Sequence, residues 1–232
     1  MIIINHKSNL NIDEIIEYEK NIRDMEVVIM PTLCYLPLFK GGKYKLGSQD
    51  ISEFKEKART GEINGEQLKS MNVAYNMIGH SERRTYNEET DETMIIKFKN
   101  CYDVGIIPVY CIGKNIEHEI DVAFNAKHDE IIFAYEPLEN IGNKKPNLDF
   151  VEKRMEYIKE YILKKYNMKI KLLYGGGVSI DNIDEILKMK SQDGILVSSD
   201  ALNIEHLRIL YNKCKDKKLW KIIFCFFIKF IV

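Results

Sequence analysis

Short runs of β-branched and other apolar residues alternate along the chain with segments whose apolar residues recur every three to four positions. The first pattern is typical of strands and the second of amphipathic helices. The apolar runs predict strands at Ile2–Asn5, Glu26–Met30, Tyr44–Gly47, Val73–Ile78, Ile106–Ile112, Ile131–Tyr135, Ile170–Tyr174 and Asp193–Val197. The helical pattern predicts helices at Ile12–Arg23, Gly65–Met71, Asp91–Asp103, Ile116–Ala126, Leu148–Tyr166, Ile180–Met189 and Ile204–Cys214.

This alternation favours an α/β protein with an eightfold β/α barrel. Eight units in 232 residues come close to the roughly 250 residues typical of that fold. A doubly wound open sheet is the alternative, but no Gly-x-Gly-x-x-Gly follows the first strand, which weakens its dinucleotide-binding form. We expect a single barrel domain over residues 1–214, followed by an atypical apolar tail over residues 215–232.

Composition and charge narrow the class of protein. The chain is 45% hydrophobic and 30% charged with a net charge of −1, which suits a globular core and argues against a general nucleic-acid binder. Its five cysteines are odd in number and form no Cys-x-x-Cys pair, which favours reduced thiols over disulfides or a zinc site. No secretory leader and no membrane-spanning run is evident. We expect a cytoplasmic protein with no metal, nucleic-acid or membrane partner.

Chemically useful residues follow several of the predicted strands. Asn5 and Lys7 come at the end of the first strand, His80 after the fourth, Glu136 after the sixth and Gly175–Gly177 after the seventh. Singly, each has an ordinary explanation: a solvated lysine, a rim carboxylate or a plain turn. In a barrel, however, the carboxyl ends of the strands share one face. An amide, an ammonium, an imidazole and a carboxylate would then lie beside a glycine turn suited to phosphate.

Such a set suits proton abstraction next to a carbonyl. A carboxylate removes the carbon-bound proton while a neutral imidazole and a lysine stabilise the negative charge that develops on oxygen. A phosphate held by the glycine turn would position the reacting end of the substrate. An isomerisation of this kind needs no cofactor.

The order and spacing of these motifs resemble the triosephosphate isomerase family from about Ile2 to Cys214. The resemblance is carried by Asn5-His6-Lys7, Gly79-His80-Ser81-Glu82-Arg83-Arg84, Ala134-Tyr135-Glu136-Pro137 with Ile141-Gly142, Tyr174-Gly175-Gly176 and Asp193-Gly194-Ile195-Leu196-Val197. Gly47-Ser48-Gln49-Asp50 and Thr60-Gly61-Glu62 fit as well. The resemblance implies interconversion of dihydroxyacetone phosphate and D-glyceraldehyde 3-phosphate, a step of glycolysis and gluconeogenesis.

The resemblance also implies a role for each site residue. Glu136 would be the base and His80 the neutral electrophile, a pairing already known for this family. Lys7 would stabilise the enediolate, Asn5 would hydrogen-bond the substrate, and Glu82 would be a carboxylate that holds the site together.

Further positions match the family's phosphate cradle, lid and subunit contact. The phosphate group would be held by Gly142, Gly177, Ser198 and Ser199. A lid from Pro137 to about Asn147 would close over the substrate. The loop around Thr60 resembles one that inserts into the neighbouring subunit, which implies a homodimer.

Two motifs depart from the family pattern. The lid tip reads Asn143-Lys144 where the family typically has Thr-Gly, and Ser198-Ser199 stands where it usually has Gly-Gly. Serine amides can bind phosphate only if the backbone needs no positive φ there. The departures leave open a paralogue that isomerises another small ketose phosphate. A phosphate-binding barrel without catalysis is a third possibility, but the intact Lys7, His80 and Glu136 argue against it.

The last stretch of the chain is unusually apolar. From Trp220 to Val232 only Lys221 and Lys229 are polar. This stretch is too short to span a bilayer as a helix. An extended or altered C-terminus that packs on the barrel, or a coding accident such as a frameshift, is the main interpretation, and membrane attachment is the alternative.

Overall fold

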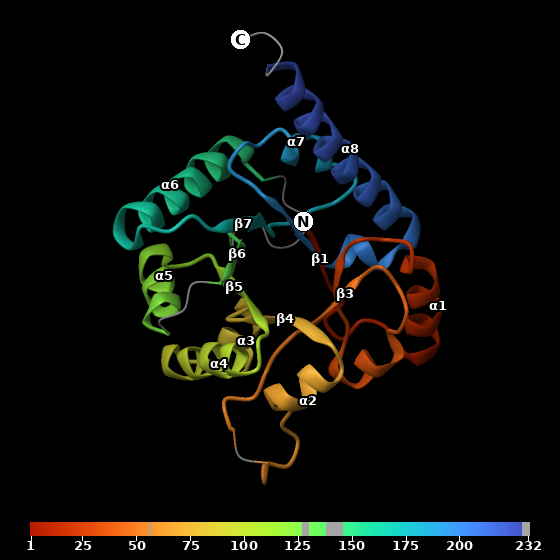
Figure 1. Ribbon diagram of the computed structural model, residues 1–232, viewed down its shortest axis with the longest axis vertical. Helices are drawn as coiled ribbons and strands as arrows, with labels where there is room; N and C mark the ends of the chain where they lie inside the picture. Colours follow the sequence, from red (N-terminus) through yellow and green to blue (C-terminus); the bar gives the residue numbers. More distant parts are fainter. Residues whose placement is uncertain (56, 127–129, 138–145, 229–232) are drawn as a thin grey trace.

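The computed structural model describes residues 1–55, 57–126, 130–137 and 146–228, with side chains described up to Lys217. In these residues, parallel strands close into a barrel in sequence order, and β8 pairs with β1. Figure 1 shows the helices arranged around the strands. The strands are β1 Ile2–Asn5, β2 Val28–Met30, β3 Lys45–Ser48, β4 Val73–Ile78, β5 Ile107–Ile112, β6 Ile132–Tyr135, β7 Lys171–Tyr174 and β8 Gly194–Val197. The predicted barrel is confirmed, and the open sheet is not what forms.

The helices lie largely where the hydrophobic pattern predicts them. They are α1 Ile12–Ile22, α2 Gly65–Ser70, α3 Ser81–Tyr86, α4 Asp91–Asp103, α5 Ile116–Asn125, α6 Leu148–Tyr166, α7 Ile183–Ile186 and α8 Ile204–Ile228, with 3₁₀ turns η1 Leu33–Leu38 and η3 Ser199–Leu202. The pattern did not predict α3, η1 or η3, because pieces this short complete too few turns to show a helical period.

Side-chain hydrogen bonds decide where two of the helices begin. The Asn11 side chain accepts from the amides of Asp13 and Glu14, and Glu14 reaches back to the Asn11 amide. This reciprocal cap starts α1 at the predicted residue. At α7, by contrast, the Ile180 amide donates to Asp200. The segment that was predicted to begin a helix at Ile180 therefore starts as a loop, and α7 has only four residues.

The side chains along each strand alternate between two apolar layers. Ile3, Val109 and Leu173 belong to a core inside the barrel. Their neighbours Ile4 and Tyr110 belong to the larger core between the strands and the helices. Because successive strand residues point to opposite faces, the same alternation decides which polar residues point into the barrel at its two ends.

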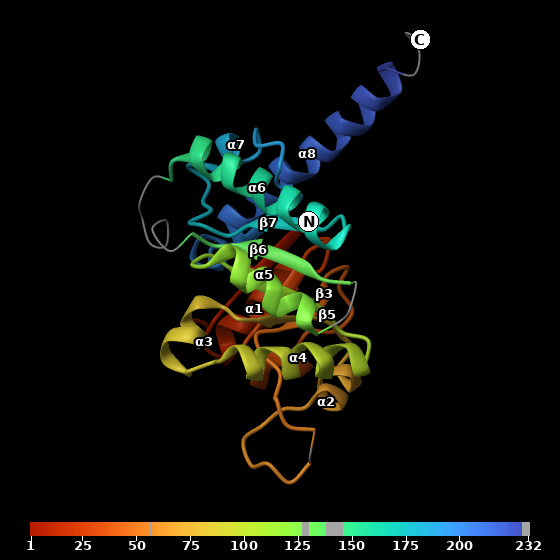
Figure 2. The same cartoon turned by 90° about the vertical axis from the view of Figure 1, so that its left-hand side faces the viewer.

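The last helix continues beyond its predicted end at Cys214. In Figure 2, α8 extends away from the barrel. The Lys217 ammonium still contacts the barrel domain, donating to the Met189 carbonyl at 3.3 Å. None of the helices, over the residues described, has the length and apolar character needed to cross a membrane. The side chains of residues 218–232, which carry the interpretations of the tail, lie outside the described residues.

Candidate active site

A cavity of about 590 Å³ opens at the carboxyl ends of the strands. It brings together predicted site residues that are far apart in sequence: Asn5, Lys7, His80, Glu82, Glu136, Gly177, Ser198 and Ser199. Gly142 and most of the predicted lid lie outside the described residues. The polar rim predicted from the strand ends therefore forms around one cavity.

Glu136 is the most deeply enclosed charged group of this cavity. Its side chain is only 6% exposed, and its Oε2 lies 3.5 Å from Nε2 of His80. The thiol of Cys111 lies 3.7 Å from Oε1. Burial raises the pKa of Glu136, and His80 and Lys7 offset this only in part. A carboxylate held out of water in this way is a stronger base than one on the surface.

The position of Glu136 depends on a glycine across from it. A Cβ on Gly175 would lie 2.8 Å from Cγ of Glu136. The glycine turn after β7 thus leaves the space that the carboxylate occupies.

The protonation of His80 follows from its place at the start of α3. Its Nδ1 accepts a hydrogen bond from the Glu82 amide at 3.3 Å. A nitrogen that accepts has no proton, so the neutral ring carries its proton on Nε2, the nitrogen that faces Glu136. Gly79 makes the turn before it with a φ of +68°, where a side chain would collide with Arg84 and Tyr110. The local fold therefore turns Nε2, and not Nδ1, toward Glu136.

Lys7 is held in a strained conformation by its neighbours. Its φ of +52° lies in the left-handed region, which is costly for a residue other than glycine. Its amide donates to Asn5 Oδ1 at 3.0 Å, and its carbonyl accepts from Thr32 and Gln49, each at 2.8 Å. Its ammonium lies 2.5 Å from the Glu82 carboxylate. Lys7 and Glu82 are thus in contact. Such a contact is needed if Glu82 holds Lys7 in position.

Thr32 and Gln49 were not predicted as site residues. Gln49 belongs to a stretch that fits the family pattern, but nothing in the sequence connects either residue to Lys7. Their link depends on the closed barrel, because β1, β2 and β3 must be adjacent before these side chains can reach one carbonyl.

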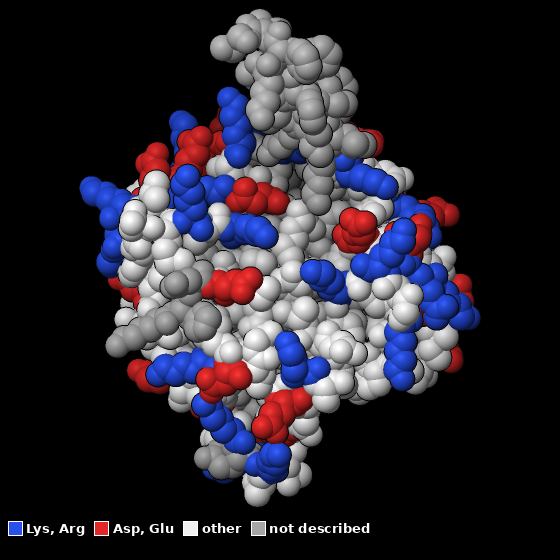
Figure 3. All heavy atoms as spheres, viewed as in Figure 1, with Lys and Arg blue, Asp and Glu red and all other residues white. Residues whose placement is uncertain are grey.

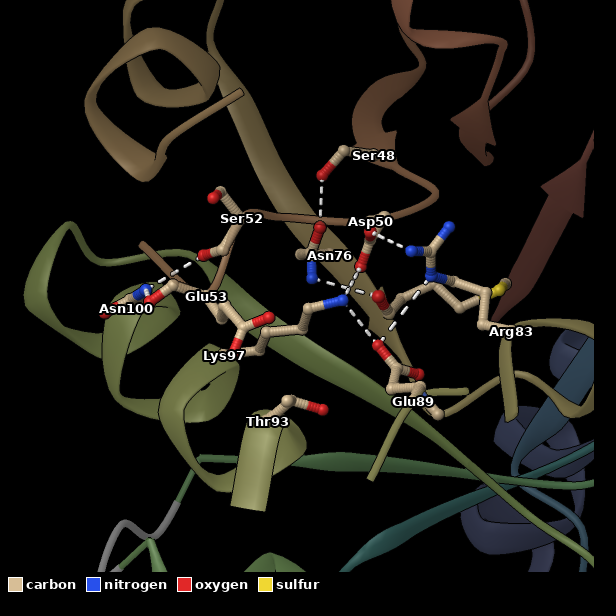
Figure 4. A network of polar contacts seen from close by, with 12 residues as sticks. Ser48, Asp50, Ser52, Glu53, Asn76, Arg83, Glu89, Thr93, Lys97 and Asn100 are labelled. Atoms are coloured by element: carbon tan, nitrogen blue, oxygen red, sulfur yellow. Dashed lines mark hydrogen bonds and ion pairs between the residues drawn. The ribbon is translucent and has the colours of Figure 1, made fainter. Parts of the chain in front are cut away.

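An ionic network joins Asp50, Arg83, Glu89 and Lys97 (Figure 4). The Lys97 ammonium contacts Asp50 at 2.7 Å and Glu89 at 2.5 Å, and Arg83 contacts Asp50 at 2.7 Å. Lys97 is only 6% exposed. Burial raises the pKa of Asp50, against the opposing effect of Lys97 and Arg83. The network joins α3, α4 and the loop after β3, and the sequence did not predict it.

Glu89 connects this network to the loop that carries His80. Its second carboxylate oxygen accepts from the Gly79 amide at 3.1 Å. The residue directly before His80 is therefore tied to a group that α4 holds in place through Lys97.

The predicted phosphate cradle has backbone conformations that suit its residues. Gly177 has a φ of +66°, where glycine is favoured, and its carbonyl accepts from Asn182 at 2.8 Å. Ser198 has a φ of −124°, and Ser199 has no positive φ either. Neither position requires a positive φ, so serine can occupy both. No group of three or more potential metal ligands occurs among the residues described.

The sequence matches the profile of one family, described as triosephosphate isomerase, over residues 1–214. The chain belongs to the triosephosphate isomerase family. It is therefore an isomerase, and the family match agrees with the resemblance seen in the motifs.

Individual members of the family cover most of the chain. It is 37% identical to a triosephosphate isomerase of Buchnera aphidicola over 84% of this chain and 87% of the relative. A triosephosphate isomerase of Dictyoglomus thermophilum is 33% identical, with 82% and 87% covered. One from Clostridium botulinum is 30% identical, with 90% and 96% covered.

Proposed function

We propose that this isomerase interconverts dihydroxyacetone phosphate and D-glyceraldehyde 3-phosphate. The observation that carries the proposal is one cavity in which the buried Glu136 lies 3.5 Å from Nε2 of His80 and which Lys7 also lines. These are the groups that proton transfer between adjacent carbons requires. Relatives that bear this enzyme's name support the choice of substrate.

In the proposed reaction, Glu136 removes a proton from the carbon next to the carbonyl. Nε2–H of His80 donates a hydrogen bond to the carbonyl oxygen as it gains negative charge. Lys7 stabilises the resulting enediolate through its positive charge, and Asn5 hydrogen-bonds the substrate. The protonated Glu136 then returns the proton to the neighbouring carbon, which completes the isomerisation and restores the carboxylate.

The substrate phosphate is proposed to lie against the backbone amides of Gly177, Ser198 and Ser199. These residues line the same cavity as Glu136. Gly142 and the lid, which begins at Pro137, would complete the cradle and exclude water. Holding the phosphate places the carbonyl within reach of the base.

The chain is further proposed to act as a cytoplasmic homodimer in glycolysis and gluconeogenesis. The loop that contains Thr60 extends away from the barrel in both Figure 1 and Figure 2, and Thr60 itself is exposed. A protruding loop can insert into a second copy. Light scattering on a sizing column tests this: a particle near twice 27.2 kDa is expected, and a monomer contradicts it.

Turnover on D-glyceraldehyde 3-phosphate, compared with a four-carbon ketose phosphate, tests the substrate assignment. We expect a clear preference for the triose. A preference for the larger sugar would favour the paralogue that the unusual lid and cradle suggest. No turnover on either, with retained binding of phosphate ligands, would favour the inactive barrel.

Glu136→Asp tests the assignment of the base. Withdrawing the carboxylate by one methylene should lower kcat by about 10² or more, because general-base catalysis depends on reach. Glu160→Asp, on the exposed side of α6, is the matched control and should retain full turnover. If wild type and Glu136→Asp are equally slow while both remain folded, the assignment of Glu136 is wrong.

A further inference from the structure

The end of the barrel opposite the candidate active site has two lysines at inward-facing strand positions. Lys45 is the first residue of β3 and Lys171 the first of β7. The residues that follow them, Leu46 and Leu172, lie in the core between strands and helices. By alternation, Lys45 and Lys171 therefore point toward the barrel axis. Bulky branched apolar residues usually dominate such inward positions.

These lysines line a cavity of about 750 Å³ at the amino ends of the strands. In a closed barrel of β1 to β8, β3 and β7 lie on opposite sides. The two ammonium groups therefore approach the opening from opposite walls. Val28 and Tyr75, which belong to the core inside the barrel, lie beneath them.

The charges at this opening are not balanced within the molecule. Lys45 and Lys171, and Lys43 on the rim, are exposed and have no ion pair or hydrogen bond from their ammonium groups among the residues described. Of the two carboxylates that line the cavity, Asp193 is occupied: it pairs with Lys159 at 2.7 Å and accepts from the Leu172 amide.

Glu26 is the other carboxylate that lines the cavity with these three lysines. Figure 3 views this end of the barrel and shows both basic and acidic side chains around an uncharged centre. Like charges that converge on a concave opening with apolar walls raise the local concentration of anions.

We propose that this opening, lined by Lys43, Lys45 and Lys171, binds a small anion that carries two or more phosphate groups. Lysine binds phosphate as a point charge. Because Lys45 and Lys171 come from opposite walls, an anion with negative charge at both ends contacts both, while a compact single phosphate contacts one. The site is separate from the catalytic cavity and does not depend on the proposed reaction.

Site-resolved acetylation of lysines tests the proposal, with inorganic pyrophosphate as the probe. The protein is treated with a limiting amount of acetylating reagent, with and without pyrophosphate, and each lysine is quantified by mass spectrometry. At several times the Kd, pyrophosphate should slow the labelling of Lys45 and Lys171 by about fivefold. Lys153, an exposed lysine on α6, is the control and should be unchanged. Unchanged labelling of Lys45 and Lys171, or equal slowing at Lys153, overturns the proposal.

A variant pair separates this site from the catalytic cavity, which also offers amides to phosphate. Lys45→Gln combined with Lys171→Gln should weaken the binding of pyrophosphate by about tenfold, whereas Lys153→Gln should not. Isomerase turnover should be the same in the double variant as in wild type. If pyrophosphate inhibits turnover but binds the double variant as tightly as wild type, it binds at the catalytic cavity alone and the proposal is wrong. If pyrophosphate slows the acetylation of Lys45 and Lys171 in a protein that shows no isomerase turnover, the anion site is supported and only the proposed reaction is wrong.

Discussion

At the scale of single residues, His6 is buried, and its ring has no polar partner among the residues that the structure describes. It lies between Asn5 and Lys7, the residue is 1% exposed, and neither ring nitrogen has a hydrogen bond to a described residue. Its ring stands edge-on to Tyr18 at 4.4 Å and near Phe39 at 6.5 Å. Burial lowers the pKa of His6 to about 3. The imidazole is thus neutral in the folded protein over the whole physiological range.

The lowered pKa of His6 predicts that the folded protein loses stability in mild acid. An unfolded histidine has a pKa of 6.5, so between pH 6.5 and 3 the unfolded state binds a proton that the folded state does not. Stability is therefore fully present above pH 6.5 and falls as the pH drops. At pH 4.5 the loss should be about 2–3 kcal/mol.

His6→Phe removes the titrating group and should abolish this part of the loss. Urea unfolding of both proteins at pH 7.5 and pH 4.5 measures it. The difference between the two pH values should be smaller in the variant. An equal acid-induced loss in both proteins would show that His6 is not responsible.

The raised pKa of Glu136 has a consequence for activity. If Glu136 acts as the base, as proposed, it must be ionised to accept a proton, so kcat/KM should fall as the pH drops through the pKa of Glu136 in the free enzyme. Since burial raises that pKa, the acid limb should lie above the ordinary value of 4.5. A profile of kcat/KM measured at constant ionic strength checks this, and a limb at or below 4.5 contradicts it.

At the scale of elements, the network around Lys97 determines how α4 is attached to the loop that carries His80. Lys97→Met removes the buried cation between Asp50 and Glu89, and the partly exposed Arg83 remains beside both carboxylates. Losing one partner of a buried pair costs about 3–5 kcal/mol. Lys99→Met, on the exposed side of α4, is the control and should cost little. Chemical unfolding of both variants measures the effect, and similar stabilities would mean that the network contributes nothing.

At the scale of the whole molecule, we propose that the isomerase domain ends near Cys214 and that residues 215–232 are an addition to it. The family match stops at residue 214, and α8 continues beyond the barrel. Truncation after Lys218 keeps the Lys217–Met189 contact and removes the apolar stretch that begins at Trp220.

This truncation should leave turnover unchanged and Tm within a few degrees of wild type. It should also reduce aggregation, since removing an apolar stretch lowers the tendency of a chain to associate. Activity, Tm and light scattering measure the three effects. A large fall in Tm would show instead that the segment packs on the barrel, and a gain in turnover would show that it interferes with the enzyme.

The sequence by itself determined the strand–helix order, the barrel and the site residues that directly follow strands. It did so because these depend on local features: the period of apolar positions, a cap such as Asn11, and glycines where the chain turns. The spacing of Lys7, His80 and Glu136 after their strands was enough to place them on one rim, because the strands are parallel.

The tertiary structure alone decided which distant side chains meet. No local sequence pattern indicates that Thr32 and Gln49 donate hydrogen bonds to the Lys7 carbonyl. The same is true of the ionic network around Lys97 and of the burial of the His6 ring. The direction of Lys45 and Lys171 likewise follows from the strand register, because the alternation along a strand does not show which face is inside until the barrel has closed.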